Sequence, residues 1–241
     1  MSMPIEKSEG CNTLIKFNGL GMHGAINVMP MHVESLSPTM TEGSLCDWVG
    51  SIAGDCYGSK DDMEKNVARA LSCARRGHTS PWEHAYITLR CIVDRGTSHA
   101  LVRHRHCAFM QSSTIYENFK RYNTLNIVGL PDKDPCNGKD VKQITDNELD
   151  IYNRAAREYM LETGEGVEPA RARDLIPTCL ATTLIITTNI PQWIYMIRRR
   201  RGHGDSVRMH CWSKICEKWF IDNYPTVWLA FEQWYDKGRP L

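Results

Sequence analysis

The amino-acid sequence predicts an α+β fold, in which a single domain holds a mixed or antiparallel sheet flanked by helices. Apolar residues recur at helical spacing in several segments, while residues 84–94 and 181–189 have the pattern of strands. Helices and strands do not alternate strictly, which argues against an α/β arrangement. The 241 residues are 42% hydrophobic and contain no internal repeat, so we expect one domain over residues 1–241.

The first clear helix covers residues 61–76, where apolar side chains are three and four residues apart. Ser59 or Asp61 is the expected N-cap, and Gly77 is the expected stop.

A strand over residues 84–94 follows, because apolar and polar residues alternate there. Gly96 ends this strand, and Thr97 or Ser98 can cap a short helix that carries Arg103.

The second half of the chain begins with a polar stretch over residues 123–146, rich in Asp, Lys, Asn, Pro and Gly, which we interpret as a surface excursion within the domain. The elements expected after it are a helix over 145–162 that ends at Gly164 and Gly166, a helical turn opening at Pro169, a strand over 181–189, and helices over 192–201 and 206–221.

Composition excludes several classes of protein. A net charge of +1 provides no overall field that would draw the chain onto nucleic acid or an anionic membrane. No stretch approaches the roughly 20 apolar residues of a membrane helix, and the N-terminus lacks a signal-peptide pattern, so we expect a cytoplasmic protein. The ten cysteines form no CxxC pair, which predicts reduced, mostly buried thiols and no metal site.

The most informative motif is Arg103-His104-Arg105, followed by Ser113 after seven intervening residues. Two permanently charged, planar guanidinium groups beside hydroxyl and amide side chains can hold several anionic or carbonyl oxygens. The motif therefore indicates a site for a nucleotide or a phosphate-bearing cofactor.

Three further clusters carry polar side chains at the ends of expected elements: residues 77–84, residues 170–177, and Asn189 with the arginines at 198–201. Each also has a structural interpretation. The first could be a capped turn, and four arginines at a helix end could simply lie in solvent and complement the helix dipole.

Together the four clusters resemble the flavin-dependent thymidylate synthases, a family that makes thymidylate without a cysteine nucleophile. The family signature, Arg-His-Arg, seven residues and Ser, matches residues 103–113. The segments 78–84, 172–177 and a strand ending in Asn189 occur in the family's order, and Cys56-Tyr57 resembles an early nucleotide-contacting segment. The similarity spans about residues 46–225.

The resemblance implies a homotetramer with FAD where subunits meet, methylene tetrahydrofolate as carbon donor, NADPH as reductant, and conversion of dUMP to dTMP. The residues it assigns to the flavin are Cys56, Ser80, Arg103, His104, Arg105, Gln111, Asn189 and Tyr195. Those assigned to the pyrimidine nucleotide are Arg103, Ser113, Thr114, Arg173 and Arg200. The catalytic set is Arg200, Arg173 and His78, with Arg200 directed at the pyrimidine ring and His78 near the entrance for folate and flavin.

The chain departs from the family pattern at three positions: Ala100 replaces the usual Gln, Ile115 replaces a phosphate-side Arg, and Tyr195 replaces a His or Asn. Lys120 or Arg121 could compensate for Ile115. Because these changes lie mainly on the nucleotide side, the alternatives are an enzyme that uses UMP or dCMP, or an inactive family member.

Two alternatives belong to other classes of protein. Arg198 to Arg201 could bind nucleic acid, with Trp193, Tyr195 and Trp212 as stacking platforms. A zinc hydrolase could instead use His78, His84 and His104.

Overall fold

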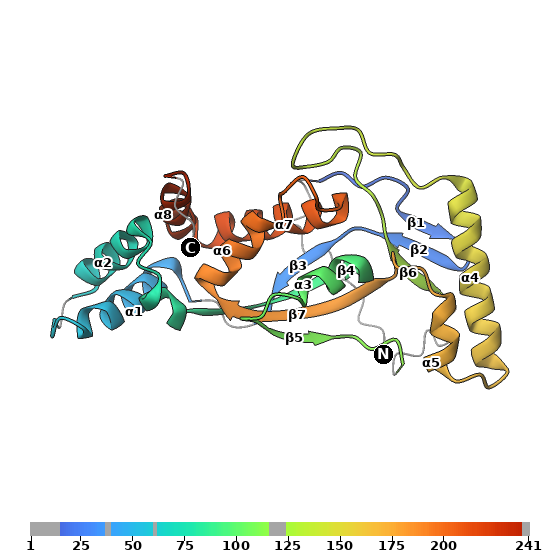
Figure 1. Ribbon diagram of the computed structural model, residues 1–241, viewed down its shortest axis with the longest axis horizontal. Helices are drawn as coiled ribbons and strands as arrows, with labels where there is room; N and C mark the ends of the chain where they lie inside the picture. The colour runs from blue at the N-terminus through green and yellow to red at the C-terminus, as the bar shows by residue number, and fades with distance from the viewer. Residues whose placement is uncertain (1–14, 37–39, 60–61, 116–123, 238–241) are drawn as a thin grey trace.

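The computed structural model describes residues 15–36, 40–59, 62–115 and 124–237 (Figure 1). Its strands are β1 (Gly21–His23), β2 (Ile26–Met29), β3 (His32–Ser35), β4 (Tyr86–Asp94), β5 (Ala108–Gln111), β6 (Leu125–Val128) and β7 (Ala181–Asn189). Its α-helices are α1 (Glu42–Asp55), α2 (Met63–Arg76), α3 (Arg95–Leu101), α4 (Asp146–Gly164), α5 (Pro169–Ala172), α6 (Ile190–Arg199), α7 (Val207–Asn223) and α8 (Pro225–Tyr235). The short 3-10 turns η1 (Ser80–His84) and η3 (Arg173–Leu175) complete the described elements.

Two sheets form the centre of the molecule, and together they confirm the predicted α+β class. The four-stranded sheet has the order β3-β4-β7-β5 and is antiparallel, whereas the three-stranded sheet β1-β2-β6 is mixed, because β2 and β6 run parallel. Figure 1 shows α1 and α2 beyond one end of the long β4–β7 pair, and α4 beside the small sheet at the other end.

The buried apolar side chains form two clusters. The larger one lies between the four-stranded sheet and helices α1, α2, α6, α7 and α8, and the smaller one joins β2 and β6 to α4 and residues 172–180. The indole N–H groups of two buried tryptophans are satisfied: Trp82 donates to the carbonyl of Ala70 and Trp193 to that of Ile87. The organisation into one domain remains a prediction.

The strand over residues 181–189 is confirmed at both ends, and Gly77 ends α2 in the left-handed conformation, with φ of 71°. The predicted cap of α2 is wrong, because Asp62 accepts from the backbone N–H of Lys65; Asp61 lies outside the described residues. The predicted caps of the short helix are wrong too: Asp94 caps α3.

Asp94 caps α3 in place of Thr97 or Ser98 because its carboxylate lies at the end of β4, just before the helix. This carboxylate accepts hydrogen bonds from both the backbone N–H and the hydroxyl of Thr97. A charged acceptor one residue before the helix is a better cap than a hydroxyl inside it. The helix also ends at Leu101, so Arg103 lies in the turn after it.

Several predicted elements are displaced by one or two residues. The strand predicted from residue 84 begins at Tyr86, since residues 80–84 form η1. The helix predicted over 192–201 begins at Ile190, because the side chain of Asn189 caps it and Pro191 occupies its first turn. The helices predicted over 145–162 and 206–221 are α4 and α7.

The polar segment predicted as a surface excursion does not lie wholly on the surface. Its residues Leu125 to Val128 form β6, and Leu125, Ile127 and Val128 are buried. Asp134 is also buried, with 5% of its surface exposed. The four-residue strand was too short for its pattern to stand out among the polar residues around it.

Candidate active site

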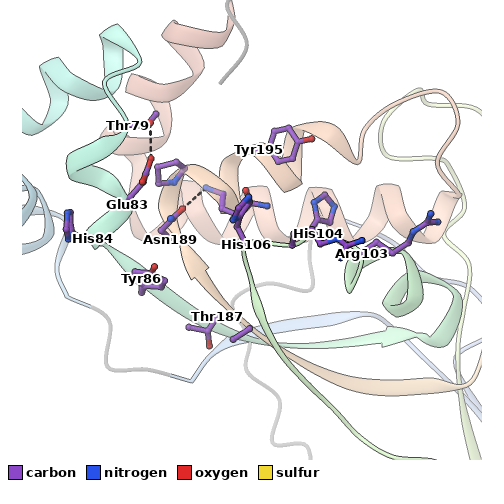
Figure 2. Close-up of a pocket in the computed structure, with 14 residues that line it drawn as sticks. Thr79, Glu83, His84, Tyr86, Arg103, His104, His106, Thr187, Asn189 and Tyr195 are labelled. Atoms are coloured by element: carbon purple, nitrogen blue, oxygen red, sulfur yellow. Dashed lines mark hydrogen bonds between the residues drawn. The ribbon is translucent and has the colours of Figure 1, made fainter.

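A cavity of about 1200 Å³ lies where β4 begins and β7 ends (Figure 2). Five predicted site residues line it: Arg103, His104, Arg105, Asn189 and Tyr195. Figure 2 shows Thr79, Glu83 and His84 on the η1 side, and Arg103 and His104 on the opposite side, with Asn189 and His106 between them.

Asn189 is held by two elements at once. It is the last residue of β7, where it pairs with Tyr86, and its side-chain oxygen accepts from the backbone N–H of Gln192 at 2.9 Å, which caps α6. Because both a strand register and a helix cap fix it, Asn189 is a rigid part of the cavity wall.

The Arg103–Arg105 segment is the turn that connects α3 to β5. The backbone N–H of His104 donates to the carbonyl of Leu101, and the hydroxyl of Thr188 donates to the carbonyl of His106 at 2.6 Å. Arg103 and Arg105 are exposed, and among the described residues neither forms an ion pair. The turn therefore presents two unpaired guanidinium groups to the cavity.

His104 is uncharged at neutral pH. Burial and, to a smaller extent, the positive charges of Arg200 and Arg199 together lower its pKa to about 4, while Asp205 opposes them. The Nε atom of Arg200 donates to Nε2 of His104 at 3.1 Å. Arg200 itself lies behind His104 and is not among the residues that line the cavity.

Two predicted site residues lie toward the other end of β7: Gln111, which the resemblance assigns to the flavin, and Ser113, which it assigns to the nucleotide. Gln111 pairs with Leu184, five residues before Asn189, which is about 17 Å along the strand. The amide of Gln111 donates to the hydroxyl of Ser98, and the hydroxyl of Ser113 accepts from the backbone N–H of Ile115.

Thr114 is buried, with 7% exposed, whereas Arg173 is exposed at the start of η3. Burial lowers the pKa of Arg95, and the neighbouring charge of Arg173 lowers it further. None of the residues Gln111, Ser113, Thr114 and Arg173 lines the cavity. Lys120 and Arg121 lie outside the described residues.

His78, Ser80 and Cys56 are all exposed and do not line the cavity, although His78 and Ser80 flank Thr79, which does. The lining residues that the motifs did not single out are Tyr86, Ala108, Thr187, Pro191 and Gln192. The strand alternation held a signal for two of them. Tyr86 and Thr187 occupy the outward positions of β4 and β7, opposite to the core.

The chain is similar in sequence to proteins of one known family. A family model described as thymidylate synthase complementing protein matches residues 47–208, two thirds of the sequence. The chain belongs to this family. It is 24% identical over 175 residues to a probable flavin-dependent thymidylate synthase of Paramecium bursaria Chlorella virus 1, covering 66% of this chain and 77% of the relative. A flavin-dependent thymidylate synthase of Corynebacterium glutamicum is 26% identical over 220 residues, which is 84% of this chain and 85% of the relative.

A third relative, the flavin-dependent thymidylate synthase of Corynebacterium efficiens, is 26% identical over 190 residues, covering 73% and 76% of the two chains. These matches confirm the resemblance to flavin-dependent thymidylate synthases that the motifs indicated.

The arginine run at 198–201 is used within this family member's own fold. Arg198 pairs with Glu232, Arg200 with Asp205 and Arg201 with Glu217. Trp193 and Trp212 are fully buried. The predicted nucleic-acid platform is therefore wrong, because its two tryptophans cannot reach a base and most of its cations are already neutralised.

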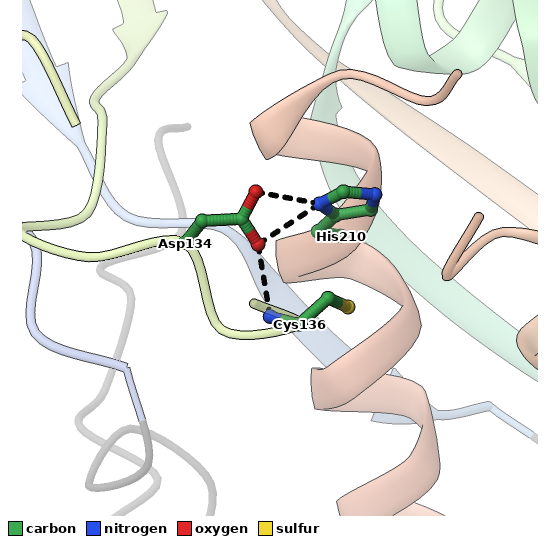
Figure 3. Close-up of side chains that lie close together, drawn as sticks. All are labelled: Asp134, Cys136 and His210. Atoms are coloured by element: carbon green, nitrogen blue, oxygen red, sulfur yellow. Dashed lines mark hydrogen bonds and ion pairs between the residues drawn. The ribbon is translucent and has the colours of Figure 1, made fainter. Parts of the chain in front are cut away.

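The Asp134, Cys136 and His210 side chains form a second polar cluster, away from the cavity (Figure 3). Nδ1 of His210 lies 2.8 and 2.9 Å from the two carboxylate oxygens, and its Nε2 lies 3.1 Å from the carbonyl of Gly202. Both ring nitrogens face acceptors, which is the arrangement of a charged imidazolium in an ion pair. Burial raises the pKa of Asp134, but hydrogen bonds from the Cys136 backbone and from His210 outweigh it, so the pKa is lowered.

This cluster is the group of potential metal ligands found within the described residues, and His78, His84 and His104 are not part of it. Six of the described cysteines are buried; Cys11 lies outside the described residues. Within the described chain, no helix combines the length and apolar character needed to cross a bilayer.

Proposed function

We propose that this chain is a flavin-dependent thymidylate synthase, which methylates carbon 5 of dUMP reductively to give dTMP. Methylene tetrahydrofolate supplies the carbon and NADPH supplies the reducing equivalents. The observation that carries this proposal is the Arg103–Arg105 turn, which lines a cavity of about 1200 Å³ beside Asn189 in a chain that belongs to the family.

The cavity residues fit FAD. Arg103 and Arg105 offer unpaired guanidinium groups for the pyrophosphate oxygens, and the amides of Asn189 and Gln192 offer neutral hydrogen bonds on the same wall. When bound, the flavin supplies the hydride and electron chemistry, while the protein orients the ligands and excludes water. The exposed His78 and Ser80 lie beside Thr79, at the edge where folate and flavin would enter.

The nucleotide-binding part of the site comes from a neighbouring copy of the chain, in a homotetramer. The support is the position of Ser113, which follows Gln111, because the β7 residue paired with Gln111 lies about 17 Å along the strand from Asn189. The outward face of the sheet is also open: Tyr86 is 63% and Met110 is 69% exposed. Subunits that pack there would bring the Ser113 end of one chain toward the cavity of another.

Arg173 and Ser113 would hold the phosphate or sugar of the nucleotide, with Thr114 behind them. The pyrimidine must become nucleophilic at carbon 5, and a guanidinium directed at its carbonyl stabilises the negative charge that develops. Arg103 would do this from the cavity wall, where both ligands meet. We place the enzyme in the cytoplasm, where these soluble co-substrates are found.

Turnover of purified protein tests the proposal. The enzyme, FAD, NADPH and methylene tetrahydrofolate are incubated separately with dUMP, UMP and dCMP, and the products are separated by chromatography. We expect a methylated product from dUMP. Conversion of UMP or dCMP alone would support the alternative that Ala100 and Ile115 suggested, and no product from any nucleotide, with FAD bound, would indicate an inactive family member.

A further inference from the structure

We propose that Arg95 binds the phosphate group of the pyrimidine nucleotide together with Arg173, at the end of the sheet where β4 ends and β7 begins. This inference deepens the proposed function, and it rests on that function only for the identity of the molecule that carries the phosphate. Arg95 is the first residue of α3, and neither the motifs nor the resemblance assigned it to a ligand.

The backbone of Arg95 is fixed against the segment that follows Arg173. The backbone N–H of Arg95 donates to the carbonyl of Leu180 at 3.0 Å, and that of Gly96 donates to the carbonyl of Thr178 at 3.3 Å. Arg173 begins η3, which leads into this segment. Figure 1 shows α5 and the start of β7 at the same end of the long β4–β7 pair, away from α1 and α2. The two arginines therefore lie on neighbouring segments, although they are far apart in the sequence.

Hydrogen bonds also connect Arg95 to the strand that leads to Ser113. The hydroxyl of Ser98 donates to the carbonyl of Arg95 at 2.9 Å and accepts from the side-chain amide of Gln111 at 2.8 Å. Ser113 lies two residues beyond Gln111, and its hydroxyl oxygen accepts from the backbone N–H of Ile115, so its proton can be donated to a ligand. The first turn of α3 and the end of β5 thus form one corner with the start of β7.

The chain does not neutralise the two arginines in this corner. Among the described residues, neither Arg95 nor Arg173 forms an ion pair. The nearby carboxylates have other partners, because Asp94 caps α3 and Asp174 pairs with Arg171 at 3.1 Å. Burial and then the neighbouring charge of Arg173 lower the pKa of Arg95. The repulsion between the two guanidinium groups is relieved when an anion binds beside both.

A phosphate monoester suits these two cations. It carries a charge of about −1.5 to −2 at neutral pH and has three acceptor oxygens. Each planar guanidinium can donate two parallel hydrogen bonds to such oxygens. A carboxylate has one charge and would leave the second cation without a counterion.

Arg95 also accounts for one of the departures from the family pattern. The resemblance places a phosphate-side arginine where this chain has Ile115, which is 38% exposed. An arginine at the start of α3 would supply this positive charge from a different element.

Calorimetric titration of the full-length protein with FAD bound tests the proposal by comparing dUMP with deoxyuridine, which lacks the phosphate. Arg95→Gln should weaken dUMP binding about tenfold or more, because a charged hydrogen-bonding partner is lost. The affinities for deoxyuridine and for FAD should stay as in the wild type. An unchanged Kd for dUMP, or an equal weakening of dUMP and deoxyuridine, would overturn the proposal.

Arg171→Gln is the matched control, since Arg171 is an exposed arginine two residues from Arg173 that pairs with Asp174. We expect the Kd for dUMP to stay as in the wild type. A loss as large as that in Arg95→Gln would attribute the effect to the general positive charge of this region and would overturn the proposal.

Inorganic phosphate is the probe that does not depend on the base. It should bind to Arg95→Gln less tightly than to the wild type. If dUMP, UMP and dCMP all fail to bind the wild-type protein while phosphate shows this difference, the proposed function fails and the phosphate site at Arg95 stands. Equal binding of phosphate by the two proteins would overturn it.

Discussion

Replacing His210 by Leu should strongly destabilise the fold. His210 and Asp134 are 4% and 5% exposed, and both oxygens of the carboxylate lie within 2.9 Å of the imidazole. The Leu variant would leave a buried carboxylate without its cation, which costs about 3–5 kcal/mol. For a chain of this size that loss corresponds to a fall in melting temperature of roughly 6–20 °C.

Thermal and urea unfolding should be compared at one protein concentration, because assembly itself adds to stability. A second variant with both His210→Leu and Asp134→Asn should recover more than about 1 kcal/mol, since the neutral amide no longer needs a cation. Lys218→Gln, which breaks a partly exposed pair with Asp222, serves as the control and should cost about 0.3–0.5 kcal/mol.

The reasoning would be refuted by a loss below about 1 kcal/mol in His210→Leu with an unchanged urea dependence. A chelator should leave the melting temperature of the wild-type protein unchanged. If the chelator lowered it as much as the substitution does, the cluster would be a metal site and the ion-pair interpretation would be wrong.

Three further predictions concern other parts of the molecule. Gly77→Ala should cost roughly 2–5 kcal/mol of unfolding free energy, because φ is 71° and a Cβ would lie 2.2 Å from the Trp234 ring. Gly58→Ala is the control: φ is 64° there and no atom lies within 4 Å of the added Cβ, so it should cost only about 1–2 kcal/mol. Equal losses in the two variants would contradict a clash with Trp234. The free energy of unfolding should fall below about pH 4, because the pKa of Asp134 is lower in the folded protein than its ordinary value of 3.8. The ionised carboxylate stabilises the fold fully above that ordinary value, and this stabilisation is lost as the pH falls through the folded pKa. Urea unfolding of the wild type and of Asp134→Asn at a series of pH values checks this. Arg105→Gln should weaken FAD binding about tenfold or more by flavin fluorescence titration, and an unchanged Kd would remove Arg105 from the flavin site.

Local patterns predicted the long elements well. The β-branched run of residues 181–189 predicts both ends of β7 correctly, because a central strand is buried and is therefore rich in β-branched residues. The helix caps were harder. The alternating pattern predicts Asp94 only as the end of a strand, yet Asp94 also caps α3. A single sequence does not show which of several neighbouring polar side chains will cap a helix.

Some features of the candidate site could likewise be predicted from the sequence, and others could not. The Arg103–Arg105 motif and Asn189 meet at one cavity, as their order along the chain suggested. The sequence did not show that Arg200 would lie behind His104, or that Gln111 would be placed well along β7 from Asn189. Both depend on strand register and on packing between distant segments, which short motifs do not encode.

Asn189 carries a consequence for how this protein can change. An aspartate at this position would cap α6 at least as well and would favour the positive end of the helix, so it would raise stability. The same substitution would put a negative charge into the wall that faces an anionic cofactor. Stability and ligand affinity therefore pull in opposite directions at this residue, and an uncharged amide is the compromise that satisfies both.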